Sequence, residues 1–220
     1  MLVEERMSRP VLTITKDVPV QDALAMMKKD HVRRYPVVDG QGNLIGIVTN
    51  TDLLNASPSE ATTLSVWEIN YLLTKITVER VMATKVISVT GDTTIEEAAQ
   101  LMADSKVGGL PVLRDQKLVG IITETDLFGV FLEMLGARCA GVRVTVEVDD
   151  VAGKIHEITG VISQLGGNIH GLGAIQGSSA GKTDLTLKVS GVDQAVLEKA
   201  LIPAVDKVLN IRLEKGTGCK

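Results

Sequence analysis

Two seven-residue motifs in this 220-residue chain combine a glycine, a threonine and an aspartate at one spacing. The residues from Gly46 to Asp52 read GIVTNTD, and those from Gly120 to Asp126 read GIITETD. Each motif lies where an apolar strand is expected to lead into a helix, whose first N–H groups and dipole favour an anion. Threonine can hydrogen-bond a phosphate or ribose oxygen, and an ionised aspartate can accept from two ribose hydroxyls. The pattern therefore favours binding of a nucleoside phosphate.

The same side chains also have a purely structural interpretation. Thr49, Thr51, Thr123 and Thr125 are favourable helix N-caps, and an aspartate in the first helical turn complements the helix dipole. One motif alone favours this interpretation, because such caps are common. The duplication at identical spacing shifts the balance towards binding.

The motifs belong to an internal repeat that organises the first two thirds of the chain. Residues 3–54 align with residues 78–128 at an offset of 75, which falls to 74 after a gap in a hairpin turn. Each copy predicts a β-α-β-β-α unit, with extended segments at 11–15 and 86–90 and hairpin strands at 35–38, 44–49, 110–113 and 118–123. The first helices carry apolar stripes: Val20, Ala23, Leu24, Met27 and Ile95, Ala98, Ala99, Met102.

The sequence of the repeat also predicts where its helices begin. Pro19 suits a first helical turn, and Thr94 with Glu97 forms a capping-box pattern. The second helix of each copy is expected to open directly after the hairpin, at Thr51 and at Thr125.

Both copies resemble CBS domains, and residues 1–136 resemble a CBS tandem or Bateman module, with domains at 1–58 and 78–136 and a linker helix at 59–77. The resemblance implies a regulatory adenine nucleotide, AMP, ADP or ATP, with S-adenosylmethionine less favoured. It implies that Asp52 and Asp126 hold ribose hydroxyls and that Thr49 and Thr123 contact ribose or phosphate. The implied adenine slots are lined by Val11, Thr13, Tyr35, Pro36 and by Val86, Ser88, Leu110, Pro111.

The copies differ in charge before the Pro-Val pair of the first hairpin strand. The first copy carries His31, Arg33 and Arg34, whereas the second has Lys106 followed by Val-Gly-Gly. Arginine presents forked donors that suit phosphate, so the phosphate-bearing ligand is expected in the first cleft. The preceding lysines, Lys28 and Lys29, are equally well read as a solvated helix end. Whether a cleft draws on one copy or both stays open.

Residues 141–215 predict a second kind of domain, with the order β-α-β-β-α-β of a ferredoxin-like sandwich. Asp150, Gly153 and Asn168 stand in a pattern that resembles an ACT domain, with Ala152 where many members have proline. The resemblance implies an amino-acid ligand at these three residues. Alternatively, Gly153 packs the helix against the sheet, Asn168 fixes a turn, and the domain only dimerises. The expected class is α+β: tandem CBS β-α-β-β-α units, then a ferredoxin-like β-α-β-β-α-β ACT domain.

The order CBS, CBS, ACT, with a linker reading SVWEINYLL, resembles the acetoin-utilisation (AcuB-type) regulatory proteins. This implies regulation of acetoin metabolism through an unidentified protein target. A homodimer is expected, because paired CBS sheets and ACT edges both favour self-association. No enzyme is expected, since His31, His156 and His170 share no motif with serine, cysteine or metal-type carboxylates. One alternative is a ligand-free CBS scaffold with an ACT sensor of an amino acid. A module of a larger enzyme or transporter is less favoured, because the chain starts with Met and holds only regulatory-type domains.

Composition narrows the remaining classes. A net charge of −4 and 2% aromatic residues disfavour nucleic acid. A charged N-terminus and the lack of an 18-residue apolar run predict a cytoplasmic protein with no membrane partner. Cys139 and Cys219 lie far apart without CxxC or Cys/His spacing, so incidental thiols are expected rather than a disulfide or a zinc site. No catalytic cofactor is implied.

Overall fold

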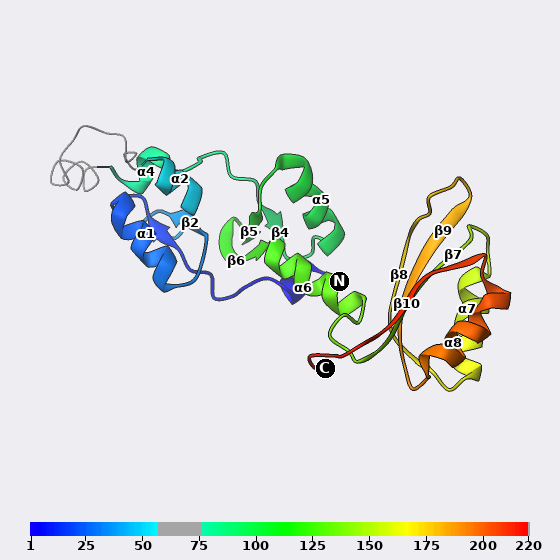
Figure 1. Ribbon diagram of the computed structural model, residues 1–220. Helices are drawn as coiled ribbons and strands as arrows, with labels where there is room; N and C mark the ends of the chain where they lie inside the picture. Colours follow the sequence, from blue (N-terminus) through cyan, green and yellow to red (C-terminus); the bar gives the residue numbers. More distant parts are fainter. Residues whose placement is uncertain (57–75, 220) are drawn as a thin grey trace. The chain divides into compact units, whose positions relative to one another are not determined.

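The computed structural model describes residues 1–56 and 76–219, and the chain forms two compact units, residues 1–127 and 128–220 (Figure 1). Most of the linker helix expected at 59–77 lies outside the described residues. Among the helices of the described part, none has the length and apolar character needed to cross a membrane.

Both expected β-α-β-β-α copies are present, and the first unit holds all of their elements except the end of the last helix, which continues past residue 127 (Figure 1). The elements of the first copy are η1 (Val3–Glu5), β1 (Ile14–Thr15), α1 (Val20–Lys29), β2 (Arg34–Val38), β3 (Leu44–Thr49) and α2 (Asn50–Asn55). Those of the second are α4 (Val78–Val81), β4 (Val89–Thr90), α5 (Ile95–Ser105), β5 (Gly109–Arg114), β6 (Lys117–Thr123) and α6 (Glu124–Met134). Each copy has a three-stranded sheet in which a two-residue strand runs parallel to an antiparallel hairpin. The strands β1 and β4 are shorter than the five residues expected.

Local sequence explains where the first helices begin. The Thr94 hydroxyl accepts from the Glu97 amide at 3.1 Å, while the Glu97 carboxylate accepts from the Thr94 amide at 2.9 Å. The predicted capping box is thus confirmed, and it satisfies amides that lack a partner at a helix start. In α1, Pro19 is the N-cap itself, one position earlier than the first helical turn. Of the predicted stripe, Leu24 is only partly buried, and the other three residues are buried.

The two copies exchange their opening segments. Ser8, from the start of the first copy, pairs with Ile121 in β6 of the second copy, with amide-to-carbonyl distances of 2.9 and 3.2 Å. Ala83, from the start of the second copy, pairs in the same way with Ile47 in β3 of the first, at 2.9 Å in both directions. Each copy therefore completes the other.

The glycine of each motif makes room for this exchange. A Cβ atom at Gly46 would lie 2.7 Å from the Met82 sulfur, closer than carbon and sulfur approach without bonding. At Gly120, a Cβ atom would collide with the side chain of Met7. The glycines therefore admit the methionine of the opposite opening segment, a packing role that is separate from ligand binding.

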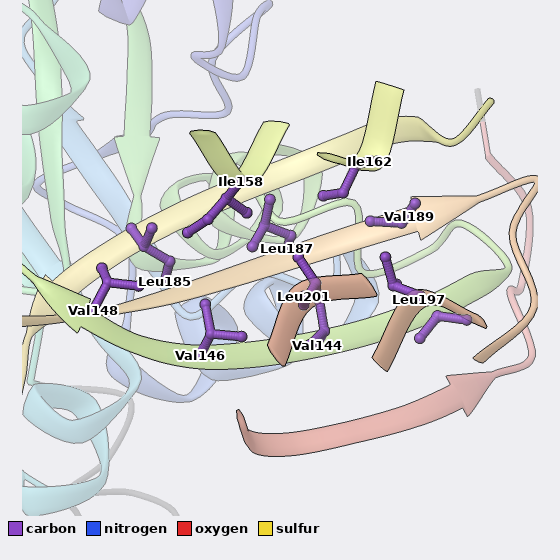
Figure 2. Packing of buried hydrophobic residues seen from close by; sticks show 11 residues of the cluster. Val144, Val146, Val148, Ile158, Ile162, Leu185, Leu187, Val189, Leu197 and Leu201 are labelled. Carbon is purple, nitrogen blue, oxygen red and sulfur yellow. The ribbon is translucent and has the colours of Figure 1, made fainter. Parts of the chain in front are cut away.

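The second unit has the element order β-α-β-β-α-β. Its elements are β7 (Gly141–Asp149), α7 (Lys154–Gln164), β8 (Asn168–Gln176), β9 (Lys182–Ser190), α8 (Gln194–Leu201), η2 (Ile202–Ala204) and β10 (Lys207–Glu214). The sheet is antiparallel, with the strand order β10-β7-β9-β8. Figure 2 shows both helices on one face of this sheet, where α7 contributes Ile158 and Ile162 and α8 contributes Leu197 and Leu201 to the core.

Alternation along β7 and β9 gives the two faces different characters. Alternate residues of β7 from Val142 to Val148 point into the core, as do Leu185, Leu187 and Val189 of β9. Lys188 stands between two of these core residues and belongs to the opposite face, yet it is only 2% exposed. Its Nζ donates to Glu214 Oε2 at 2.7 Å, which pairs the buried charge.

The segment after α6 also packs on β8. A Cβ atom at Gly171 would collide with the backbone of Leu135 and Gly136, and one at Gly173 would lie 2.8 Å from the Leu135 side chain. Two glycines in β8 thus let the turn after α6 lie directly against the strand.

Candidate functional site

A cavity of about 550 Å³ lies in the first unit and draws on both copies. The first copy supplies the segment before β1 and the residues around the start of β2: Ser8, Pro10, Val11, Leu12, His31, Val32, Arg33, Arg34 and Pro36. The second copy supplies Gly108 and the β6–α6 junction: Ile121, Thr123, Glu124, Thr125 and Asp126. The volume lies within the range of about 300–1,000 Å³ that is usual for small-molecule sites.

The motif at the β6–α6 junction is held rigidly by its own hydrogen bonds. The Asp126 Oδ2 atom accepts from the Thr123 hydroxyl at 2.7 Å and from the Thr123 amide at 2.8 Å. Thr49 and Asp52 repeat this geometry at 2.6 and 2.8 Å, and the Asp52 amide also donates to the Thr49 hydroxyl. The capping interpretation is therefore correct for Thr49, the N-cap of α2. It is wrong for Thr51 and Thr125, which lie inside the first turns of α2 and α6, because both helices begin one residue earlier than expected. Capping is compatible with binding, because Thr123 and Asp126 line the cavity as well.

Arg34 spans the space between the copies. A Cβ atom at Gly108 would lie 2.7 Å from Arg34 Nη2, and one at Gly109 would lie 2.5 Å from Nη1. These two glycines are the repeat equivalents of Arg33 and Arg34, so the uncharged copy provides the room that the charged copy fills. Burial lowers the pKa of the Arg34 guanidinium, and the nearby carboxylate of Glu124 works in the opposite direction. The group is thus partly desolvated and strengthens electrostatic contact with an anion.

Some of the expected site residues line the cavity, and others are their repeat equivalents in the opposite copy. Val11, Arg33, Arg34 and Pro36 line the cavity together with Thr123 and Asp126, so the basic residues of the first copy face the motif of the second. Of the two arrangements that the sequence leaves open, the shared one describes this cavity. The repeat offset relates its lining to a counterpart set that includes Val86, Lys106 and Pro111 with Thr49 and Asp52. Thr13 and its equivalent Ser88 are half-buried and outside the cavity lining.

Two of the expected adenine-slot residues belong to the core instead. Tyr35 is 1% exposed and Leu110 is fully buried, and neither lines the cavity. They occupy equivalent positions one residue before the proline of β2 and β5, so their side chains point away from the cavity-facing Arg34 and Pro36. The Tyr35 hydroxyl donates to Asp30 at 2.7 Å, and burial together with this bond raises the tyrosine pKa.

Several cavity residues were not among the sequence-predicted ones: Ser8, Pro10, Leu12, Val32, Ile121, Glu124 and Thr125. Strand alternation offers a signal for Ile121, which lies two residues before Thr123 and so shares its face. No comparable signal identifies Ser8, because its position depends on pairing with the other copy.

The tentative amino-acid site of the second unit is not assembled within one chain. Asp150 and Gly153 follow β7, at the end of the sheet where Asp149 pairs with Lys182. Asn168 pairs with Ser190, at the other end of β9. The eight residue steps from Lys182 to Ser190 correspond to about 27 Å of strand. Gly153 is the N-cap of α7 with φ of 94° and open space beside it, so a left-handed backbone, not helix packing, accounts for the glycine.

The expectation of incidental thiols is wrong. Cys139 and Cys219, 80 residues apart in sequence, form a disulfide with a Cα–Cα distance of 4.4 Å. The antiparallel pairing of β10 with β7 sets Glu214 opposite Gly141. The chain after β10 therefore returns to the segment that precedes β7, which brings the two cysteines together.

Comparisons with known proteins agree with the paired repeat in the N-terminal part of the chain. Residues 3–59 and 78–133 match the CBS domain family. A CBS domain-containing protein of Dictyostelium discoideum is 33% identical over 136 residues, which cover 61% of this chain and 94% of the relative. The chain spans only 23% of another relative, the L-aspartate semialdehyde sulfurtransferase of Methanocaldococcus jannaschii, at 28% identity over 59% of this chain.

Solved structures resemble the same region. A putative acetoin utilization protein (AcuB) from Vibrio cholerae has 32% identity and a TM-score of 0.52 over 62% of this chain and 93% of its own. The CBS pair of protein MJ0100, in complex with 5′-methylthioadenosine and S-adenosyl-L-methionine, has 27% identity and a TM-score of 0.50, covering 60% and 95%. CBSX2 of Arabidopsis thaliana, in complex with AMP, has 28% identity and a TM-score of 0.50, covering 60% and 96%. The chain belongs to the CBS domain family and carries a tandem pair of these domains.

Proposed function

We propose that the first unit is a non-catalytic regulatory module that binds an adenine nucleotide in the cavity between its two CBS copies. The cavity itself carries this proposal, because it joins two arginines, a capped threonine–aspartate motif and apolar walls in about 550 Å³. Apolar surface for a base, acceptors for a ribose and cations for a phosphate are the groups that a nucleotide requires.

Each part of the ligand has a proposed contact. Asp126 Oδ2 accepts from Thr123, and the second carboxylate oxygen is proposed to accept from ribose hydroxyls. Arg33 and Arg34 face the phosphate. The base lies against Val11, Pro36 and Ile121, which are apolar residues of the lining.

The arginines favour a phosphate-bearing ligand over a purely adenosyl one. The neighbouring structures include complexes with AMP and with two adenosyl compounds that carry no phosphate, 5′-methylthioadenosine and S-adenosyl-L-methionine. A phosphate can accept hydrogen bonds from both guanidinium groups, whereas a ligand without a phosphate offers no such acceptor. We therefore propose AMP, ADP or ATP for this chain and place S-adenosylmethionine second.

The counterpart cleft is proposed as a weaker site. By the repeat offset, its set has Gly108 and Gly109 where the described cavity has Arg33 and Arg34, and Lys106 where the cavity has His31. Asp52 and Thr49 keep the geometry needed for a ribose. With one lysine for a phosphate instead of two arginines, affinity for the nucleotide is expected to be lower.

The second unit is proposed as an ACT-type, ferredoxin-like domain that passes nucleotide occupancy to a protein partner, in a homodimer. Its β-α-β-β-α-β order and sheet order support the fold assignment. The likeness to an acetoin utilization protein supports a role in acetoin metabolism. The ligand can bias the arrangement of the units only by its difference in affinity for the alternatives.

Calorimetric titration of the full chain with AMP, ADP, ATP, 5′-methylthioadenosine and S-adenosylmethionine tests the proposal. Replacing Asp126 by Asn retains an oxygen for the Thr123 cap and removes the charge, and Asp52→Asn is the matched control. Hydrogen bonds to charged groups contribute about 1.5–3 kcal/mol, so D126N is expected to weaken nucleotide binding about 10- to 100-fold at the stronger site. D52N is expected to leave that site unchanged.

A second pair of measurements separates phosphate from adenosine recognition. Arg34→Met keeps an unbranched side chain over Gly108. It is expected to weaken the affinity for AMP about 10-fold or more and to change the affinity for 5′-methylthioadenosine by less than about two-fold. Equal losses for D126N and D52N would contradict the assignment of the cavity. Absence of binding by all five compounds would favour the ligand-free CBS scaffold, with an amino acid sensed by the second unit.

A further inference from the structure

The Cys139–Cys219 disulfide lies in the second unit beside a histidine and a cavity. Cys139 is in the turn after α6, where its amide donates to the Gly136 carbonyl at 3.0 Å, and is 8% exposed. Cys219 is exposed and lies in the tail beyond β10. The bond therefore joins one buried and one exposed cysteine.

The tail is held against the Cys139 segment by its backbone. The amides of Thr217 and Gly218 both donate to the carbonyl of Arg138, at 3.0 and 3.1 Å. A Cβ atom at Gly216 would collide with the backbone of Cys139 and Ala140. These contacts do not involve the sulfur atoms, so they are expected to keep the two cysteines adjacent when the disulfide is reduced.

His170 is placed to act on Cys219. Its Nδ1 lies 3.7 Å from the Cys219 sulfur, and its Nε2 lies 2.7 Å from the hydroxyl of Ser190 on the adjacent strand. The hydroxyl fixes the ring orientation from the far side. An imidazole that can carry a proton next to a sulfur stabilises the thiolate, which is the reactive form of cysteine.

A cavity of about 360 Å³ opens onto this group of residues. Its lining includes both cysteines, His170, Arg138, Gly136 and Gly218. That volume admits a small organic molecule. Since both cysteines line it, a molecule in this cavity lies beside the disulfide.

We propose that Cys139 and Cys219 form a thiol–disulfide exchange site for a small organic thiol and its disulfide, in which Cys219 is the nucleophile, Cys139 resolves the intermediate and His170 stabilises the Cys219 thiolate. In the oxidising direction, the Cys219 thiolate attacks one sulfur of the small disulfide, RSSR. A mixed disulfide forms on Cys219, and one RS⁻ leaves and takes up a proton. The Cys139 thiolate then attacks the Cys219 sulfur, which forms the Cys139–Cys219 bond and expels the second RS⁻.

The small disulfide is the oxidant in this exchange. Two protein thiols lose two protons and two electrons, and RSSR becomes two RSH. The reverse sequence reduces the protein disulfide at the expense of two small thiols. This activity is independent of nucleotide binding in the first unit.

Glutathione in its reduced and oxidised forms is the probe. The folded full-length protein is equilibrated in buffers of varied ratio, quenched with iodoacetamide and analysed by mass spectrometry of the cysteine peptides. A reversible transition between disulfide and dithiol is expected. A bond that stays oxidised in a large excess of reduced glutathione would be a purely structural one and would overturn the proposal.

Two matched variants identify the nucleophile. In Cys139→Ser, oxidised glutathione is expected to leave one adduct on Cys219, because the resolving thiol is missing. In Cys219→Ser, Cys139 is expected to acquire the adduct at least 10-fold more slowly, since this cysteine is buried. Equal rates would contradict the assigned roles, and the wild-type redox titration remains decisive if either variant fails to fold.

The role of His170 has its own readout. For the reduced protein, the alkylation rate of Cys219 at pH 7 is expected to fall about three-fold in His170→Ala and to be equal to wild type near pH 9.5, where the thiol is ionised in both. A loss of rate that is the same at both pH values would indicate a structural role only. Stoichiometric zinc or copper bound to the three side chains of the reduced, purified protein would overturn exchange in favour of a metal site.

Discussion

The ion pair between Lys188 and Glu214 gives the most quantitative test of the second unit. Lys188 is 2% exposed, and its ammonium donates to the Glu214 carboxylate at 2.7 Å. Replacing Glu214 by Gln keeps the size and an acceptor oxygen but leaves a buried ammonium without a counter-charge. Breaking a fully buried pair costs about 3–5 kcal/mol. Because the Glu214 side chain is 26% exposed and water reaches it, we expect a loss of about 2–3 kcal/mol.

Arg212→Ala is the matched control. Arg212 also contacts Glu214, with a distance of 2.7 Å between Nε and Oε1, but its side chain is 58% exposed. Exposed pairs contribute about 0–1 kcal/mol, so this variant is expected to stay close to wild type. The double variant Lys188→Met with Glu214→Gln is expected to recover most of the loss, since it removes the buried charge itself.

Hydrogen–deuterium exchange of peptides from β9 measures the result within the full chain. A loss of 2–3 kcal/mol corresponds to exchange about 30- to 150-fold faster through unfolding of this strand in E214Q. If the exchange rates of β9 in E214Q and R212A differed by less than three-fold, the argument from burial of Lys188 would fail.

The same pair predicts a dependence on acid. The hydrogen bond from Lys188 holds the pKa of Glu214 below its usual value, partly opposed by burial of the carboxylate. The ionised form therefore stabilises the folded unit fully above about pH 4.3, and this contribution is lost as the pH falls through the lower folded value. When stability is followed against pH by hydrogen exchange or circular dichroism, the loss of stability below about pH 4.3 is expected to be less steep in E214Q than in wild type. Equal slopes would contradict the role of the Glu214 carboxylate.

Three further substitutions test the packing. Gly46→Val is expected to cost about 1–3 kcal/mol by overpacking against Met82, whereas Gly40→Val, at an open turn position, is expected to cost less than 1 kcal/mol; comparable melting temperatures would contradict the packing role. Ile158→Ala, in the core of the second unit, is expected to lower the free energy of unfolding of this unit by about 2–5 kcal/mol, measured by hydrogen–deuterium exchange of β9. A loss below 1 kcal/mol would be inconsistent with the burial of Ile158. Thr94→Ala removes the capping box of α5 and is expected to cost about 1 kcal/mol, visible as faster exchange confined to the first unit.

Local chemistry in the sequence predicted the elements well. The capping box at Thr94, the apolar stripe of α1 and the hairpins around the Pro-Val pairs are all determined by neighbours within a few residues. The alternation of β7 likewise defines which of its residues are buried. In each case the interactions that fix the structure lie within the pattern itself, and a single sequence contains them.

The composition of the cavity depended on contacts that no local pattern contains. The repeat shows that Arg34 and Gly109 are equivalent positions, but only the packed structure shows that one side chain fills the space left by the other. The burial of the Tyr35 side chain, in contrast, follows from strand alternation, which puts it on the opposite face from Arg34 and Pro36. The cysteine pair depended on β10 lying beside β7, a neighbour relation that sequence spacing does not express.

The exchange of opening segments has a consequence for cooperativity. Met7 packs at Gly120 and Met82 packs at Gly46. The opening segment of each CBS copy therefore packs on the sheet of the other copy. If one copy were excised at the repeat boundary, its methionine would lose its contact with the glycine of the other copy. The space beside its own glycine, which the methionine of the other copy fills, would be exposed. The two copies are therefore expected to melt in one transition despite having separate sheets, so that any ligand in the shared cavity stabilises both halves by the same free energy.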